Sequence, residues 1–198
     1  MGSDGGSSGG GKAGGAGRPG RSGGLPYSSK LSAPLNEQEQ RAIYAYTHQP
    51  YRDLNRRLNE GTPLTAEQRD IVEGLDSGLG KAPSFNRDTY RVLGFELNPQ
   101  LDGSFSPERD AFVAKHVVGD YVEYPAYVSA SKSPTNYGFN KTDAPYTVRI
   151  RFSSRQAKDI KNMGVERDHE VTFARNSRFR VAAVERLKGG GYEIRLTD

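Results

Sequence analysis

The sequence predicts an α+β fold in which three helices precede a run of short strands. The first part, up to about residue 80, places apolar side chains at helical spacing behind two capping signals. The second part, from about residue 88, consists of short segments rich in β-branched and aromatic residues. Because helices and strands do not alternate along the chain, a doubly wound parallel sheet is excluded.

The three predicted helices have recognisable starts. Asn36 with Glu39 has the spacing of a capping box at the start of the first helix. Pro50 is expected to interrupt this helix, because proline has no backbone N–H to donate, so that a second helix follows from residue 51. Thr65 with Gln68 repeats the capping pattern and predicts the start of the third helix.

Two glycines, Gly78 and Gly80, are expected to end the third helix, and the segments that follow are typical of strands. The predicted strands cover residues 88–97, 112–118, 122–131, 146–152, 170–173 and 178–185. The last segment is expected to turn back on itself at Gly189–Gly191 as a hairpin.

The N-terminal segment differs in composition from the rest of the chain. Residues 1–24 contain 12 of the 24 glycines, and such a segment buries too little apolar surface to offset the entropy of ordering. We therefore expect residues 1–33 to form a flexible Gly/Ser-rich linker or tail and residues 34–198 to form one folded domain. The length of this linker suggests a larger protein upstream.

Charge and composition exclude several classes of protein. Residues 1–30 carry +3 of the net charge of +4, so the folded part is nearly neutral and the basic pI is weak evidence for nucleic-acid binding. The absence of cysteine excludes disulfide scaffolds, thiolate metal sites and cysteine nucleophiles. No apolar run reaches the length of a membrane span, and the first residues lack the apolar core of a secretory signal peptide, so we expect none in this sequence.

Five polar residues on predicted strands stand out as candidates for chemistry. Arg91 lies among residues expected to be buried, while Ser129 and Ser131 are two apart and therefore share a strand face. Asp168 and Glu170 are also two apart, at the start of a strand. By itself, each feature is more often structural: a salt-bridged arginine, ordinary strand serines and a solvated strand end.

In combination, these residues resemble the motifs of the Arg–Ser–Glu class of mono-ADP-ribosyltransferases, in particular its bacterial toxin and phage-type members. Arg91 in YRVLG corresponds to the arginine of the family's first core strand, and Ser129–Ala130–Ser131 to its Ser–Thr–Ser strand. Asp168–His169–Glu170 corresponds to its E-x-E or Q-x-E pair. The segments YTHQPYRDLN and RFRV also look like the family's, so the resemblance spans residues 34–197. It implies N-terminal helices followed by a mostly antiparallel, split β-sheet core.

The resemblance also implies roles for the central residues. The family breaks the nicotinamide glycosidic bond of NAD, its substrate, through an oxocarbenium-like transition state without a metal. Glu170 would bind the ribose and stabilise the developing positive charge, and Arg91 would bind the diphosphate. Ser129 would hydrogen-bond Glu170 to aim it, with Ser131 supporting the same face. Asp168 would orient the acceptor, but it is one methylene shorter than the family's glutamate or glutamine.

Two aromatic residues and one segment complete the implied site. Tyr137 and Phe139 lie where the family has a loop that closes over NAD, and either could stack on nicotinamide or simply pack in the interior. Residues 161–169, KNMGVERDH, match the family's acceptor-recognition loop.

The expected function is therefore transfer of ADP-ribose from NAD to a macromolecule by a toxin or effector domain. A protein arginine is favoured as acceptor over RNA, because the folded part is nearly neutral. The alternatives are an NAD glycohydrolase, whose acceptor is water, and an inert binding module on the same fold. A toxin would be delivered into a target-cell cytoplasm, without a membrane partner, and would require a cognate immunity protein that occludes the active site.

Overall fold

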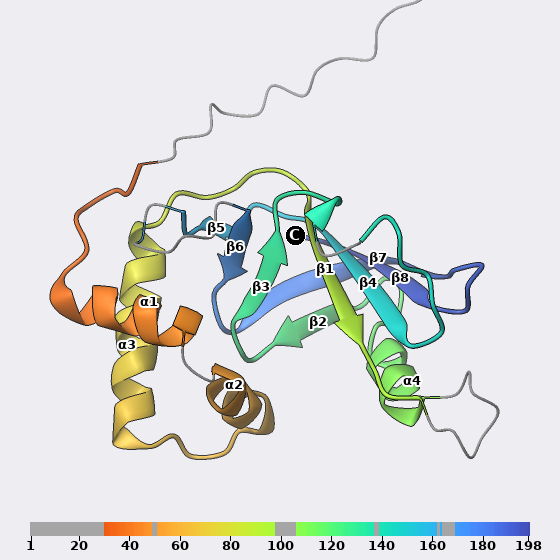
Figure 1. Ribbon diagram of the computed structural model, residues 1–198, viewed down its shortest axis with the longest axis horizontal. Coiled ribbons are helices and arrows are strands. Elements are labelled where there is room, and N and C mark those ends of the chain that lie inside the picture. The colour runs from red at the N-terminus through yellow and green to blue at the C-terminus, as the bar shows by residue number, and fades with distance from the viewer. Residues whose placement is uncertain (1–29, 49–50, 98–105, 137–138, 162, 164–168) are drawn as a thin grey trace, which may run out of the picture.

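A computed structural model describes residues 30–48, 51–97, 106–136, 139–161, 163 and 169–198 (Figure 1). The predicted α+β order is confirmed, with helices first and a mostly antiparallel sheet after them. The helices are α1 (Glu37–His48), α2 (Tyr51–Glu60), α3 (Ala66–Lys81) and α4 (Pro107–Ala114). The strands are β1 (Thr89–Gly94), β2 (Tyr121–Tyr124), β3 (Val128–Ser131), β4 (Thr147–Ser153), β5 (Lys158–Asp159), β6 (Glu170–Phe173), β7 (Ser177–Arg186) and β8 (Tyr192–Thr197).

Both predicted capping boxes are present. The backbone N–H of Asn36 donates to the Glu39 carboxylate at 2.8 Å, and the N–H of Glu39 donates back to the Asn36 side chain at 2.9 Å. Thr65 and Gln68 make the same reciprocal pair at the start of α3. Separate helices lie on the two sides of the predicted interruption, since α1 ends at His48 and α2 begins at Tyr51, and Pro50 itself lies outside the described residues.

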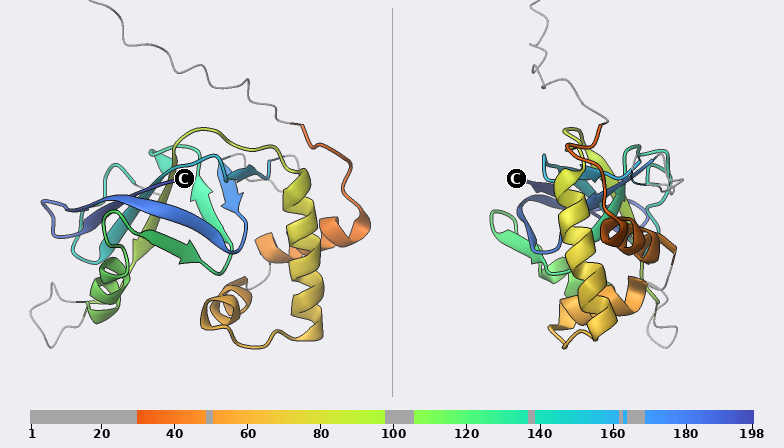
Figure 2. Two further views of the ribbon diagram at one scale, coloured as in Figure 1. Left: turned by 180° about the vertical axis from the view of Figure 1, so that it is seen from behind. Right: turned by 90° about the vertical axis from the view of Figure 1, so that its left-hand side faces the viewer.

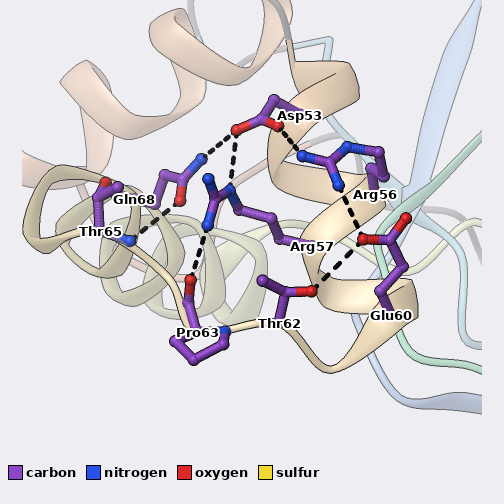
Figure 3. A network of polar contacts seen from close by, with 8 residues as sticks. All are labelled: Asp53, Arg56, Arg57, Glu60, Thr62, Pro63, Thr65 and Gln68. Carbon is purple, nitrogen blue, oxygen red and sulfur yellow. Dashed lines mark hydrogen bonds and ion pairs between the residues drawn. The ribbon is translucent and has the colours of Figure 1, made fainter.

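A polar network holds α2 against the start of α3 (Figure 3). The Asp53 carboxylate accepts hydrogen bonds from Arg56 at 2.6 Å, from Arg57 at 3.1 Å and from the Gln68 amide at 2.9 Å. These donors, Arg56 first, lower the pKa of Asp53. Arg57 also donates to the carbonyl of Pro63 in the connecting loop. The network therefore ties the capping box of α3 to the preceding helix.

The prediction that Gly78 and Gly80 end the third helix is wrong, because α3 continues to Lys81. Two glycines of the helix, Gly74 and Gly78, allow close packing instead. A Cβ on Gly74 would lie 2.6 Å from the Ala42 Cβ and 2.9 Å from the carbonyl oxygen of Gln38, and one on Gly78 would lie 3.1 Å from Ile43. These positions allow α1 to cross α3 closely, a tertiary constraint that local helix propensity does not report.

We expect Gly74→Ala to lower the free energy of unfolding by about 1–3 kcal/mol, because the added methyl group meets backbone as well as a side chain. Gly80→Ala is the matched control on the same helix, since its Cβ would meet nothing within 4 Å. It should stabilise by about 1 kcal/mol through helix propensity. Urea unfolding of both variants measures the difference, and equal effects would contradict the close crossing.

The strands form one sheet in the order β2-β7-β8-β4-β1-β3-β6-β5, with only the β4–β8 pair parallel among the described strands. β7 and β2 pass behind β3 and β1 in Figure 1 and in front of them in the reverse view of Figure 2. Phe179 of β7 contacts Phe152 of β4 and Phe173 of β6, each at a ring separation of 5.2 Å. The strands that were expected to form a split core therefore belong to one sheet. This sheet folds over so that aromatic side chains of β4, β6 and β7 pack against each other.

Two predicted strands differ from the structure. Residues 112–118 do not form a strand, because most of them belong to α4 or to the turn after it. Ser106 caps this helix by accepting from the Arg109 N–H at 3.3 Å, and Pro107 occupies its first turn. Residues 122–131 form two strands, since Pro125 cannot donate to a ladder and separates β2 from β3.

The helices flank the sheet at opposite ends. α1 and α3 lie beside β6 and β5, α2 lies below the start of β3, and α4 lies at the far end, near β1 and β4 (Figure 1). None of the helices in the described part of the chain is long and apolar enough to cross a membrane.

Candidate functional site

Four of the predicted site residues lie on the adjacent strands β1, β3 and β6, namely Arg91, Ser129, Ser131 and Glu170. Arg91 of β1 donates from Nη1 to the backbone oxygen of Ser129 at 2.6 Å, so its guanidinium reaches along β3. Glu170 is the first residue of β6 and is 6% exposed. Strand pairing alone therefore brings together an arginine, a serine and a glutamate that are far apart in the sequence.

The register defines how the two serines relate to Glu170. Ser131 pairs directly with Glu170, and Ser129 pairs with Thr172. Ser131 is fully buried, and its hydroxyl both donates to the Ser133 carbonyl at 3.0 Å and accepts from the Ser133 N–H at 3.1 Å. Ser131 thus fixes the turn that follows β3, directly opposite Glu170.

Tyr46 of α1 lies next to this group and was not singled out by the sequence. The Ser129 side chain and the charges of Arg91 and Glu170 all act on its hydroxyl. Burial, the largest cause, raises the pKa of Tyr46, so the phenol stays protonated at neutral pH. Tyr46 of α1 is therefore close enough to the strands for the charges of Arg91 and Glu170 to act on it.

Asn55 of α2 supports Tyr46 from the second helix. Its side-chain amide donates to the Tyr46 hydroxyl at 3.4 Å and to the backbone oxygen of Tyr127 at 3.3 Å. The Tyr46 and Tyr127 rings also meet edge to face, with centroids 5.4 Å apart. Both Tyr46 and Asn55 belong to the segment YTHQPYRDLN. The similarity of this segment to the family is the sequence feature that could have indicated these two residues.

A cleft of about 800 Å³ lies between α2, α4 and the strands β1 to β3, within the ~300–1,000 Å³ typical of ligand sites. Of the predicted site residues in the described ranges, Arg91 lines it. The lining residues are Arg52, Asn55, Arg56, Asn59, Glu60, Arg91, Leu93, Phe112, Lys115, His116, Val122, Glu123, Tyr124, Pro125, Ala126, Tyr127, Val128 and Ile150. Four cations against two carboxylates make this lining suitable for an anionic ligand.

His116 of α4 forms part of one wall of this cleft. Its Nδ1 lies 2.8 Å from the carbonyl oxygen of Phe112 and its Nε2 lies 2.9 Å from the Tyr124 hydroxyl. Because a carbonyl only accepts, Nδ1 carries the proton and Nε2 accepts from Tyr124. Burial lowers the pKa of His116 below its ordinary value, so the ring is neutral at pH 7.

This pKa shift predicts a loss of stability in mild acid. A histidine with a lowered folded-state pKa binds protons more readily when unfolded, so its contribution falls as the pH drops below about 6.5. We expect the melting temperature to decrease between pH 7 and pH 5, and His116→Gln to reduce that slope because glutamine does not titrate there. If the melting temperature changes equally with pH in both proteins, the loss of stability in acid does not come from His116.

Of the three remaining predicted site residues, the structure describes Phe139. Phe139 is 1% exposed, and its ring packs on Tyr90 at a centroid separation of 4.9 Å. The Arg149 guanidinium lies 5.0 Å from the same ring. This arrangement matches the packing alternative for Phe139. Tyr137 and Asp168 lie outside the described residues.

Comparisons with known proteins agree on one family and one fold. A sequence model described as ADP-ribosyltransferase exoenzyme matches residues 24–195. The chain is 27% identical over 166 residues to NAD(+)–protein-arginine ADP-ribosyltransferase Tre1 of Serratia proteamaculans. That match covers 83% of this chain but only 32% of the relative, so the chain spans about a third of the relative's length.

Solved structures show the same fold. Exoenzyme S of Pseudomonas aeruginosa, in a complex with human 14-3-3 protein beta and bound to carba-NAD, aligns with a TM-score of 0.61 and 20% identity over 82% of this chain and 74% of its own. The ADP-ribosyltransferase Vis of Vibrio splendidus, in complex with agmatine, gives a TM-score of 0.63 and 20% identity over 85% and 78%. At this identity the likeness establishes the fold.

Proposed function

The chain belongs to the ADP-ribosyltransferase exoenzyme family, and we propose that it transfers ADP-ribose from NAD to the guanidinium group of protein arginines. The observation that carries this proposal is the position of Arg91, Ser129 and Glu170 on three adjacent strands. A guanidinium, a carboxylate and hydroxyl groups on a rigid sheet form the set that NAD cleavage requires.

Arg91 binds the diphosphate of NAD in this proposal. A guanidinium offers parallel N–H donors that match phosphate oxygens, and the Arg91 side chain lines the cationic cleft. Its Nη1 is held by the Ser129 carbonyl, so the side chain is aimed before the substrate arrives. Asn55 and Tyr46 hold the adjoining wall of helices in place.

Glu170 acts at the bond that breaks. The bond between the nicotinamide nitrogen and C1′ of the ribose breaks, and its electron pair leaves with neutral nicotinamide. The ribose then carries an oxocarbenium-like positive charge, which the Glu170 carboxylate stabilises while binding a ribose hydroxyl. Ser131, opposite Glu170 in the register, and Ser129, on the same strand, keep this carboxylate in position.

The acceptor nitrogen forms the new bond to C1′ and loses one proton to solvent. We assign orientation of the acceptor guanidinium to Asp168, two residues before Glu170. Three observations favour arginine over RNA: the nearly neutral charge of residues 31–198, the relative named as a protein-arginine ADP-ribosyltransferase, and the Vis structure that contains agmatine, itself a guanidine.

The relatives are bacterial exoenzymes and toxins, which supports the biological setting that we propose. In our proposal, residues 34–198 are the catalytic domain of an effector, and residues 1–33 are its linker. The domain is delivered into the cytoplasm of a target cell, and a cognate immunity protein occludes its NAD cleft in the producing cell. Expression in a bacterial cytoplasm should be toxic, and co-expression of a genomic neighbour should relieve the toxicity.

The acceptor class is tested with radiolabelled NAD in a bacterial lysate, with the wild type beside Glu170→Gln. Label that depends on Glu170 and disappears with protease supports a protein acceptor. Label that disappears with ribonuclease instead identifies an RNA modifier. Nicotinamide release without label in either fraction identifies an NAD glycohydrolase, and no release at all identifies an inert binding module.

A further inference from the structure

Thr172 of β6 has a buried hydroxyl group that finds no hydrogen-bond partner within the described part of the chain. The residue is only 1% exposed. Most buried hydroxyl groups in proteins are hydrogen-bonded, because removing such a group from water is unfavourable unless a hydrogen bond replaces the lost hydration. Valine has nearly the same shape and would avoid this cost. The packing of β6 therefore does not explain why the residue is a threonine.

Strand geometry places this hydroxyl on the same face of the sheet as the proposed catalytic carboxylate. Thr172 lies two residues after Glu170 on β6, so both side chains project to one face. Val171 and Phe173 alternate with them and belong to the apolar core cluster of the sheet. The hydroxyl of Thr172 is thus part of the polar face of β6, although it is buried.

The neighbouring strand places a second hydroxyl directly opposite. β3 lies beside β6 (Figure 1), and Ser129 of β3 pairs with Thr172 in the register. Side chains directly opposite each other in an antiparallel pair share one face, with Cβ atoms about 4.5–5.5 Å apart. Two hydroxyl groups at this separation come within hydrogen-bond distance by rotation about χ1. The side chain of Ser129 is therefore within reach of Thr172.

The residue on the other side of Thr172 is directed away from the proposed site. Lys158 of β5 also pairs with Thr172 in the register. Its Nζ donates to the Ser84 hydroxyl at 3.2 Å and to the Ala82 carbonyl oxygen at 3.5 Å, just after the end of α3. Of the two residues that pair with Thr172, Ser129 is the one that belongs to the proposed site.

We propose that Thr172 is a positioning residue whose hydroxyl donates a hydrogen bond to Ser129 when NAD is bound. The inference rests on the proposed transfer reaction, in which Ser129 keeps the Glu170 carboxylate in position. Rotation of the Thr172 hydroxyl towards Ser129 fixes the serine, and the serine in turn holds the carboxylate towards the ribose. Because this alignment matters most in the transition state, loss of the hydroxyl should lower kcat while the KM for NAD changes little.

The experiment compares Thr172→Val and Thr172→Ser with the wild type in the full chain, by steady-state release of nicotinamide and by thermal melting. Thr172→Val should lower kcat about five- to tenfold, the effect of one neutral hydrogen bond, with the KM for NAD within about twofold. Its melting temperature should rise by about 2–4 °C, because a buried hydroxyl without a partner is removed. Thr172→Ser should show the opposite pattern: the hydroxyl keeps kcat within about twofold of the wild type, and the lost methyl group lowers the melting temperature.

Thr89→Val is the matched control, because it makes the same chemical change at an equally buried position. Thr89 of β1 is 0% exposed, and its hydroxyl also lacks a hydrogen-bond partner among the described residues. The next residue, Tyr90, pairs with Ser131, so Thr89 projects to the face opposite Ser131 and Glu170. Thr89→Val should raise the melting temperature by a similar amount and leave kcat unchanged.

A double variant tests whether Thr172 acts through Ser129. In a Ser129→Ala background, Thr172→Val should cause no further loss of kcat, and a full additional loss would contradict the assignment. The inference would also be overturned if kcat were equal in Thr172→Val and the wild type, or if kcat followed the melting temperature across the three single variants. Failure of the wild type to consume NAD would instead overturn the proposed function itself, so the two failures are distinguishable.

Discussion

Glu170→Gln is expected to reduce the rate of ADP-ribose transfer by about a thousandfold or more, equivalent to about 4 kcal/mol of transition-state stabilisation. The substitution keeps the size of the side chain and its position opposite Ser131, but it removes the negative charge. Because the charge on the ribose develops only in the transition state, kcat should fall while the KM for NAD changes little. Steady-state release of nicotinamide measures both constants.

The control for this prediction is Glu185→Gln on β7. Glu185 is an exposed strand carboxylate that pairs with Arg195, away from the residues around Tyr46. Its loss should leave kcat unchanged, and a melting curve of Glu170→Gln should show that the variant is folded. A kcat for Glu170→Gln within tenfold of the wild type would contradict the role of the carboxylate.

Arg91→Lys is expected to raise the KM for NAD by about ten- to a hundredfold, although the charge is kept. Lysine cannot form two parallel hydrogen bonds to a diphosphate, and each charged hydrogen bond contributes about 1.5–3 kcal/mol. The change also removes the Nη1 bond to the Ser129 carbonyl, which holds the side chain in the wild type. Titration with NAD by calorimetry and by initial rates measures the effect.

Arg178→Lys provides the comparison for this second prediction. Arg178 is an exposed strand arginine that lies 4.3 Å from the centroid of the Tyr121 ring, outside the lining of the cleft. The same chemical change there should leave the affinity for NAD unaltered. Equal affinities for NAD in Arg91→Lys and in the wild type would show that Arg91 does not bind the substrate.

The order of elements could be predicted from the sequence because capping boxes and strand alternation are local signals. Asn36 with Glu39 and Thr65 with Gln68 occur where expected, and EVTF forms β6 with the predicted bounds. Local signals failed where tertiary contacts decide. α3 continues through Gly78 because α1 packs there. Residues 112–118 were predicted as a strand, but Ser106 and Pro107 start a helix that includes the first of them.

The site could be predicted only as far as its motifs extend. Arg91, Ser129 and Glu170 were identified from motif order, and strand pairing brings them together. The register that places Ser131 opposite Glu170, and the approach of Tyr46 from α1, depend on contacts between distant segments. Lys132 and Asp159, which form an ion pair at 2.6 Å, are 27 residues apart in the sequence, and no sequence motif indicates this pair.

The most direct test of the account is the reaction of the full chain with NAD and agmatine, followed by mass spectrometry and by quantification of nicotinamide. We expect one ADP-ribose to be added to the guanidinium of agmatine for each nicotinamide released, and none with Glu170→Gln. Nicotinamide released with free ADP-ribose as the sole product would show that water is the acceptor. NAD left intact by the wild type would contradict the proposed ADP-ribosyltransferase activity itself.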